Sequence, residues 1–123
     1  RRDVVTYNSL MSGWARQMQR MDKAEAVMRE LMEYPHAKPN TRTFNTLITG
    51  YKYLHHENRN WRAERMYFWL CKMRDLNIKP DSHTAKHFTQ MNLHFPSPSS
   101  SFWIDFEKPY DPHKHGPSNR HRY

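Results

Sequence analysis

The sequence predicts an all-α fold, a short right-handed α-solenoid of about two and a half helical hairpins with an extended C-terminal tail. Three observations support this prediction. Thr6-Tyr7-Asn8 returns as Thr43-Phe44-Asn45, 37 positions later. Apolar residues in each copy recur at spacings of three and four, the period of an amphipathic helix. Self-similarity at a period of about 20–50 residues is typical of solenoids, in which each unit buries its apolar face against its neighbours.

The first unit, residues 4–40, is expected to form two helices. Asp3 is the expected N-terminal cap of the first helix. Asp22 with Glu25 three residues later has the pattern of a capping box that opens the second helix, which should end before Pro35. The apolar stripe of the first helix consists of Tyr7, Leu10, Met11, Trp14 and Met18, and that of the second of Ala24, Val27, Met28 and Leu31.

The second unit, residues 41–81, repeats this plan. Asn40 is the expected cap of its first helix, and Asn60 that of its second. Both units end on Lys-Pro followed by a short polar residue, Asn40 in the first and Asp81 in the second. The two apolar stripes are Phe44, Leu47, Ile48 and Tyr51, and then Trp61, Met66, Tyr67, Leu70 and Met73.

Residues 82–95 begin a third unit that lacks a second helix, and residues 1–3 are interpreted as the end of a preceding repeat. Residues 96–123 are rich in proline and serine, a composition that disfavours helix and sheet alike, so an extended tail is expected there. Its expected anchors are Phe102, Trp103, Ile104 and Phe106.

The charge of the chain points to a polyanionic partner, because 20 Lys and Arg face 12 Asp and Glu and the excess lies in the helical region. Cys71 is the single cysteine, which excludes an intramolecular disulfide and fits a reducing compartment. No apolar run approaches the roughly 20 residues that a membrane span requires. No membrane partner is therefore expected.

The sequence contains no arrangement typical of catalysis or metal binding. There is no nucleophile with a base, no paired carboxylates at a useful spacing and no glycine-rich phosphate loop. Adjacent His55 and His56 point in different directions on a helix, and His113 and His115 have no cysteine or acidic cluster beside them. We expect no enzymatic activity, no cofactor and no metal.

Two helices in about 35 residues, opening on Val-Val-Thr-Tyr-Asn and closing on Ile-Lys-Pro-Asp, resemble the pentatricopeptide repeat family. The resemblance covers residues 3–92, and the related tetratricopeptide repeat lacks both this asparagine and this ending. Members of this family read single-stranded RNA, one base per repeat. Some end in a zinc deaminase-like domain, whose His-x-Glu and Cys-x-x-Cys elements are absent here.

The resemblance implies which residues contact RNA. Asn8 is expected to pair with Asn40, and Asn45 with Asp81, so that each pair reads one base edge. The Asn45/Asp81 pair is expected to prefer uracil. The Asn8/Asn40 pair is expected to prefer a pyrimidine, with cytosine favoured. An amide suits this role because it offers both a donor and an acceptor. The alternative is that both reading asparagines are structural and bond the backbone at a helix start. The expected flanking and phosphate contacts are Val5 and Arg42 beside the bases, and Arg16 on a phosphate.

Further basic residues are candidates for phosphate contact. Arg59, Arg62 and Arg65 recur at a spacing of three, which predicts a basic ridge that is either solvated or in contact with phosphate. Lys86 stands where a third reading asparagine would be, and as a point charge it does not discriminate bases in that way. Two reading pairs are too few to select a unique transcript.

Three classes of function follow. The main hypothesis is a non-catalytic RNA-binding protein of a mitochondrion or chloroplast, by family resemblance. The alternative is a structural subunit of an organellar ribosome or another large ribonucleoprotein, which the few and irregular repeats favour; the tail would then anchor it to neighbouring proteins or ribosomal RNA. The third is a scaffold that binds only proteins.

Overall fold

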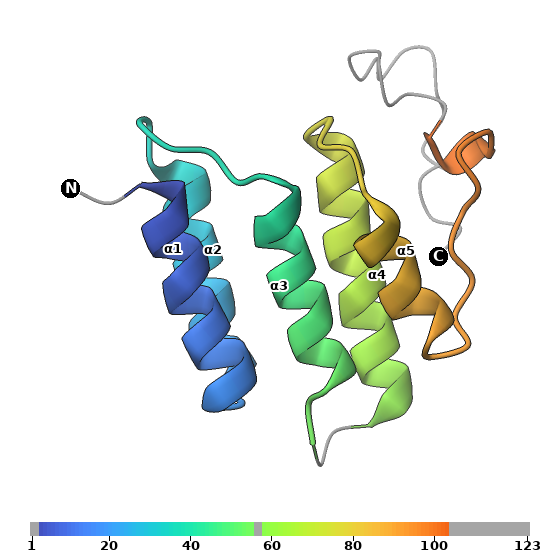
Figure 1. Ribbon diagram of the computed structural model, residues 1–123, viewed down its shortest axis with the longest axis horizontal. Helices are drawn as coiled ribbons and strands as arrows, with labels where there is room; N and C mark the ends of the chain where they lie inside the picture. The colour runs from blue at the N-terminus through green and yellow to red at the C-terminus, as the bar shows by residue number, and fades with distance from the viewer. Residues whose placement is uncertain (1–2, 56–57, 104–123) are drawn as a thin grey trace.

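A computed structural model describes residues 3–55 and 58–103, and within them the chain is helical with no strand. The all-α prediction is confirmed. Figure 1 shows that α1, α3 and α5 follow one another across the near side, with α2 and α4 behind them. The elements are α1 (Val4–Ser12), η1 (Gly13–Gln17, a π-helix), α2 (Met21–Glu33), α3 (Thr41–Lys52), α4 (Arg59–Asp75), α5 (Ser82–Thr89) and η2 (Ser101–Trp103, a 3-10 helix).

The first helix of each unit begins at a side-chain cap. Carboxylate or amide oxygens of Asp3, Asn40 and Asp81 accept the backbone N–H three residues further on, at 2.9, 3.0 and 3.1 Å. These bonds satisfy a donor that a helix N-terminus otherwise leaves unpaired. The caps predicted at Asp3 and Asn40 are confirmed.

Both second helices begin earlier than the sequence suggested. The N-cap of α2 is Arg20, which makes no side-chain capping bond, and Asp22 pairs with Arg20 at 3.0 Å. The helix has already begun at Met21, because this residue is buried against the next repeat. The N-cap of α4 is Asn58, whose side chain accepts the N–H of Trp61 at 3.1 Å, so Asn60 lies in the first turn.

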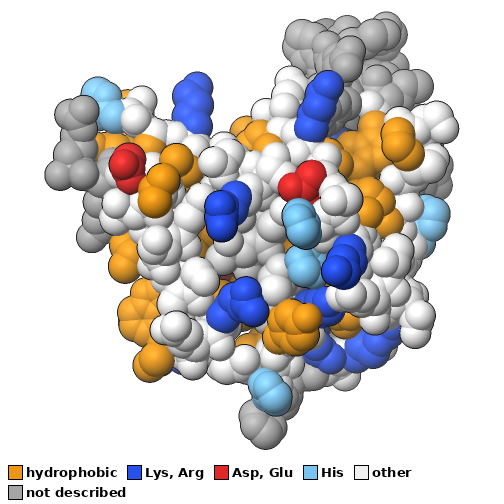
Figure 2. All heavy atoms as spheres, viewed as in Figure 1, with side chains coloured by type: hydrophobic (Ala, Val, Ile, Leu, Met, Phe, Trp, Pro, Cys, Tyr) orange, Lys and Arg blue, Asp and Glu red, His pale blue; other side chains and the backbone are white. Residues whose placement is uncertain are grey.

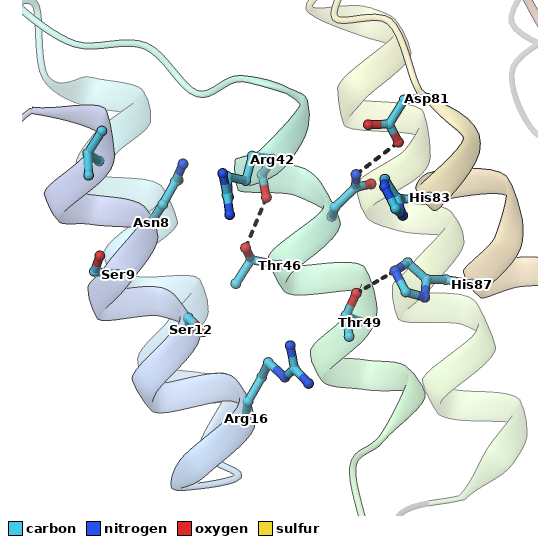
Figure 3. A pocket seen from close by; sticks show the side chains of 12 residues that line it. Asn8, Ser9, Ser12, Arg16, Arg42, Thr46, Thr49, Asp81, His83 and His87 are labelled. Atoms are coloured by element: carbon cyan, nitrogen blue, oxygen red, sulfur yellow. Dashed lines mark hydrogen bonds between the residues drawn. The ribbon is translucent and has the colours of Figure 1, made fainter.

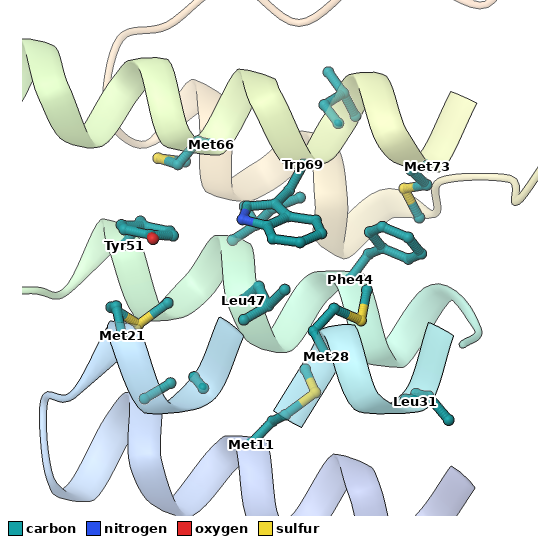
Figure 4. Packing of buried hydrophobic residues seen from close by; sticks show 14 of the residues in the cluster. Met11, Met21, Met28, Leu31, Phe44, Leu47, Tyr51, Met66, Trp69 and Met73 are labelled. Carbon is teal, nitrogen blue, oxygen red and sulfur yellow. The ribbon is translucent and has the colours of Figure 1, made fainter. Parts of the chain in front are cut away.

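The core lies between the two layers, with α3 at its centre (Figure 4). Methionines from α1, α2 and α4 fill the gaps around α3, a role that suits a flexible side chain. Most of the predicted stripes are buried, but Leu10, Met18 and Trp61 are 37%, 60% and 40% exposed. Leu10 corresponds to the fully buried Leu47, which packs in the interior of the stack.

Gly50 sits at a close approach between the two repeats. A Cβ atom at this position would lie 2.6 Å from the Sδ atom of Met21 and 2.9 Å from the Cβ atom of Ala15. Gly13 holds the equivalent place in the first unit, where a Cβ atom would meet nothing within 4 Å. Of these two described glycines, Gly50 is the one at which the packing of neighbouring repeats requires glycine.

After α5 the chain folds back and covers the end of the stack. The rings of Phe95 and Phe88 lie 5.5 Å apart, and the guanidinium of Arg74 lies 4.6 Å from the ring of Phe102. Phe102 is only 5% exposed, as expected of an anchor, and Trp103 packs on it at 4.6 Å. The other two predicted anchors, Ile104 and Phe106, lie outside the described residues.

Candidate nucleic-acid interface

A groove of about 770 Å³ runs across α1, η1, α3 and α5 (Figure 3). Six residues predicted as RNA contacts line it: Val5, Asn8, Arg16, Arg42, Asn45 and Asp81. Six that were not predicted also line it: Ser9, Ser12, Thr46, Thr49, His83 and His87. Asn40 and Lys86 do not belong to this lining. The groove therefore gathers most of the predicted positions on one face.

Equivalent positions of the repeats meet in this groove because the helices begin at equivalent caps. Val5, Arg42 and His83 each follow the capping residue of their helix by two positions. Asn8 and Asn45 each follow it by five. One spacing thus places the same face of each helix toward the groove.

The second predicted pair is joined in the structure. The Nδ2 atom of Asn45 donates to the Oδ1 atom of Asp81 at 3.1 Å, and the hydroxyl of Thr84 donates to the Oδ1 atom of Asn45 at 2.6 Å. Because a carboxylate only accepts, the amide group must turn its N–H toward Asp81. One amide N–H, one amide lone pair and the Oδ2 atom of Asp81 are left without a bond to a described residue.

Asp81 is held ionised by its surroundings. Desolvation raises its pKa, but hydrogen bonds from the backbone of Thr84, the amide of Asn45 and the hydroxyl of Thr84, with the charge of His83, outweigh that effect. The net shift of the Asp81 pKa is downward. At neutral pH the carboxylate of Asp81 therefore offers hydrogen-bond acceptors and no donor.

The first predicted pair is arranged differently. The amide oxygen of Asn40 accepts from the backbone N–H of Thr43 at 3.0 Å and from its hydroxyl at 2.9 Å. The Oδ1 atom of Asn8 is buried and accepts no hydrogen bond in the described structure. In contrast to Asn45, Asn8 has no partner among the described residues that holds its amide oxygen.

The predicted basic ridge belongs to α4, outside this groove. Arg62 donates to the carbonyl oxygen of Lys52 at 2.8 Å, at the C-terminal end of α3. Arg65 binds Glu25 at 2.8 and 2.9 Å, and Arg59 donates to the carbonyl oxygen of Met91. All three guanidinium groups are thus engaged within the protein, and none of the three residues lines the groove. Lys86 is exposed on α5, beside the groove.

The face that carries the groove is basic. Figure 2 shows Lys, Arg and His side chains spread over its middle, whereas acidic side chains occupy isolated spots. Arg16 and Arg42 make no side-chain hydrogen bond or ion pair to any described residue, and both are exposed. Mobile cations on a concave face attract a polyanion and track its phosphates.

Among the six lining residues that were not predicted from the sequence, His83 and His87 are the titratable ones. The Nε2 atom of His87 lies 2.8 Å from the hydroxyl oxygen of Thr49, and its Nδ1 atom lies 3.5 Å from the Nζ atom of Lys52. His83 could have been predicted, because it follows its capping residue by two positions, as Val5 and Arg42 do. From the sequence, histidines were considered only as metal ligands, which singled out His55, His56, His113 and His115.

None of the described helices is long and apolar enough to cross a membrane. Across residues 3–55 and 58–103, no group of three or more His, Cys, Asp or Glu side chains is placed to hold a metal ion.

Comparison with known proteins identifies the repeats. Residues 2–52 match the model of the PPR repeat family, a segment that spans the first hairpin and all of α3. No curated protein and no solved structure matches the chain. The helical hairpins and the matched segment together confirm the resemblance seen in the sequence. Residues 2–52 thus carry the pentatricopeptide repeat pattern, which supports a pentatricopeptide repeat protein.

Proposed function

We propose that this protein binds single-stranded RNA without catalysis, holding the strand in the groove between α1, α3 and α5. Pentatricopeptide repeats generally indicate RNA binding, and the proteins that carry them are mostly organellar. The observation that carries the proposal is the Asn45–Asp81 pair, joined at 3.1 Å in an open basic groove. Polar groups that converge in a groove and retain unused donors and acceptors are suited to reading a base edge.

The chemistry of this pair favours uracil. The Oδ2 atom of Asp81 accepts only, and the amide of Asn45 retains one N–H. The Watson–Crick edge of uracil offers an N–H beside a carbonyl oxygen, which matches both. Cytosine presents a ring nitrogen acceptor in place of that N–H, so it would leave a carboxylate oxygen facing a lone pair.

The first repeat is proposed to accept a pyrimidine and to favour cytosine. Asn8 and Asn40 both carry amides, so no fixed negative charge opposes a ring nitrogen acceptor. Val5 and Arg42 flank the bases from the groove lining, and Arg16 contacts a phosphate. These contacts hold the strand while the two pairs read it.

A reciprocal exchange tests the base-reading claim. Asp81→Asn turns the second pair into the first type, and Asn40→Asp does the reverse; both keep a residue that caps a helix well. Binding of short oligonucleotides that differ at one position is measured by fluorescence anisotropy. We expect each exchange to move the preference between uracil and cytosine by about 1–3 kcal/mol at its own position.

A second test removes the reading side chains together. The double substitution Asn8→Ala and Asn45→Ala should weaken binding to a pyrimidine-rich oligonucleotide, while circular dichroism confirms the fold. Unchanged binding across all oligonucleotide sequences would eliminate base reading and assign both asparagines a structural role.

The second candidate function is a subunit of an organellar ribosome or another large ribonucleoprotein. It is favoured by the two reading pairs, which give too little discrimination for one transcript. Sedimentation of a mitochondrial or chloroplast extract with and without ribonuclease distinguishes the candidates: co-migration with ribosome-sized particles supports a subunit, and a small species shifted by ribonuclease supports a transcript-binding factor. A protein scaffold would respond to neither ribonuclease nor RNA crosslinking.

The part played by the tail is tested separately. Residues 95–103 pack on α4 and α5, so a truncation after Trp103 removes the rest of the tail and leaves this packing in place. Under the subunit candidate, the truncated protein should no longer enter the particle but should still bind RNA.

A further inference from the structure

We infer that the η1 end of the groove is a phosphate site in which Arg16, Lys52 and His87 hold one RNA backbone phosphate, with His87 taking up a proton as the phosphate binds. This inference rests on the proposed RNA binding. It adds Lys52 and His87 to the phosphate contact proposed for Arg16, and it adds the uptake of a proton by His87. It also assigns a chemical role to the part of the groove that lies furthest from the reading pairs.

The surroundings of His87 suit a neutral imidazole in the free protein. Its Nδ1 atom lies 3.5 Å from the Nζ atom of Lys52, and its Nε2 atom 2.8 Å from the hydroxyl oxygen of Thr49. A lysine ammonium donates and never accepts, so both contacts are satisfied when Nδ1 carries the lone pair and Nε2 the proton. His87 is therefore neutral before RNA arrives.

The charges that face His87 are all positive. They come from Arg16 on η1, Lys52 on α3, and His83 and Lys86 on α5. Partial burial, with the charges of these four groups, lowers the pKa of His87. In Figure 3 Arg16 and His87 reach toward Thr49 from opposite walls of the groove. Cations that converge without an acid between them leave an excess of positive charge that a phosphate can neutralise.

A phosphate placed between these side chains changes the protonation of His87. Its oxygens accept from Arg16 and from Lys52, which lies beside the groove lining and also donates to the Oε1 atom of Gln90. Lys52 then no longer donates to the imidazole. The negative charge raises the pKa of His87, so the Nδ1 atom takes a proton from solvent and donates it to a phosphate oxygen. One proton is taken up for each phosphate bound, and no covalent bond forms or breaks.

This proton makes RNA affinity depend on pH with a defined sign. A group whose pKa is higher in the complex than in the free protein strengthens binding as the pH falls between the two values. Because the pKa of free His87 lies below the ordinary value of about 6.5, affinity should rise as the pH is lowered from 8 to 6. Uptake of one proton limits the rise to about tenfold per pH unit.

The experiment measures binding of an oligouridine, whose bases do not titrate in this range, to the full chain. Titration calorimetry in two buffers of different ionisation enthalpy counts the protons taken up. We expect uptake for the native protein at pH 6.5, its loss in His87→Gln, and its retention in the control His94→Gln, an exposed residue outside the groove. Circular dichroism establishes that each variant is folded.

A second readout does not require RNA. The imidazole of His87 is titrated by NMR in the native protein and in Lys52→Gln, where removal of the facing ammonium should raise its pKa. Uridine-selective binding without proton uptake would overturn this inference and leave the proposed function intact. Absence of oligouridine binding at every pH would overturn both.

Discussion

Glu25 on α2 and Arg65 on α4 form an ion pair across the junction of the two repeats. The Nη2 atom of Arg65 lies 2.9 and 2.8 Å from the two carboxylate oxygens of Glu25. The indole N–H of Trp69 donates to the same carboxylate at 2.8 Å, and so does the hydroxyl of Tyr51. Glu25 is 8% exposed, so its charge depends on these partners for solvation.

The first prediction concerns this carboxylate. Glu25→Gln keeps the shape of the side chain but leaves the partly buried guanidinium of Arg65 without a counter-ion. We expect the free energy of unfolding to fall by about 2–4 kcal/mol, measured by urea denaturation. Asp22→Asn is the control, because Asp22 pairs with Arg20 in the open. If the free energy of unfolding falls by the same amount in both variants, burial does not strengthen the contribution of the Glu25–Arg65 pair to stability.

The second prediction compares two glycines at equivalent positions. Gly50→Ala pushes a methyl group against Ala15 and Met21, and overpacking of this kind costs about 1–3 kcal/mol. Gly13→Ala meets nothing within 4 Å and should raise stability, by up to about 1 kcal/mol, through helix propensity. Thermal melts of the two variants should therefore shift in opposite directions. Shifts of the same sign would contradict the close approach at Gly50.

The third prediction addresses phosphate attraction in the groove. Arg16→Gln removes the groove cation that is assigned to a phosphate, and it should weaken binding to every oligonucleotide by a similar factor. It should also lower the slope of log affinity against log salt by about 0.7, the value for one phosphate contact on a single strand. Lys72→Gln removes a cation of α4 that lies over Phe68, outside the groove, and should leave this slope unchanged. Equal effects of the two variants would mean that the attraction is diffuse.

The fourth prediction concerns the segment that folds back after α5. Phe102→Ala removes a buried ring that packs under Arg74 and beside Trp103. Because Phe102 packs on Trp103, which contacts Phe95 and through it Phe88 of α5, backbone amides of α5 should exchange with solvent faster. Met18→Ala alters a residue that is 60% exposed at the other end, and should change exchange in α5 little. Protection of α5 that survives Phe102→Ala would assign its stability to α3 and α4 alone.

The repeated sequence pattern predicted the helices well because it reflects interactions between residues that are close in the sequence. Asp3 and Asn40 cap helices through a bond to a residue three positions away, which a sequence displays directly. Asp22 failed as a cap because several polar residues precede α2, and burial of Met21 decided where the helix begins. Local propensity does not contain that information.

The site was predicted in part for the same reason. Asn45 and Asp81 were paired through the family pattern, and the bond between them follows from equal spacing on neighbouring helices. The roles of Glu25 and Arg65 were missed because their partners lie 40 positions apart, on outer helices that no short motif connects. His87 was missed because its environment, and not its spacing, makes it notable.

The hydroxyl of Thr84 gives the two repeats different entropies of binding. Asn45 is already immobilised by Thr84 and Asp81, whereas no described residue holds the amide oxygen of Asn8. Ordering one flexible side chain on association costs about 0.5–1.5 kcal/mol, a loss that Asn45 has already incurred during folding. A strand bound in the groove would therefore lose less side-chain entropy at the second repeat than at the first, so the second repeat should contribute more to affinity.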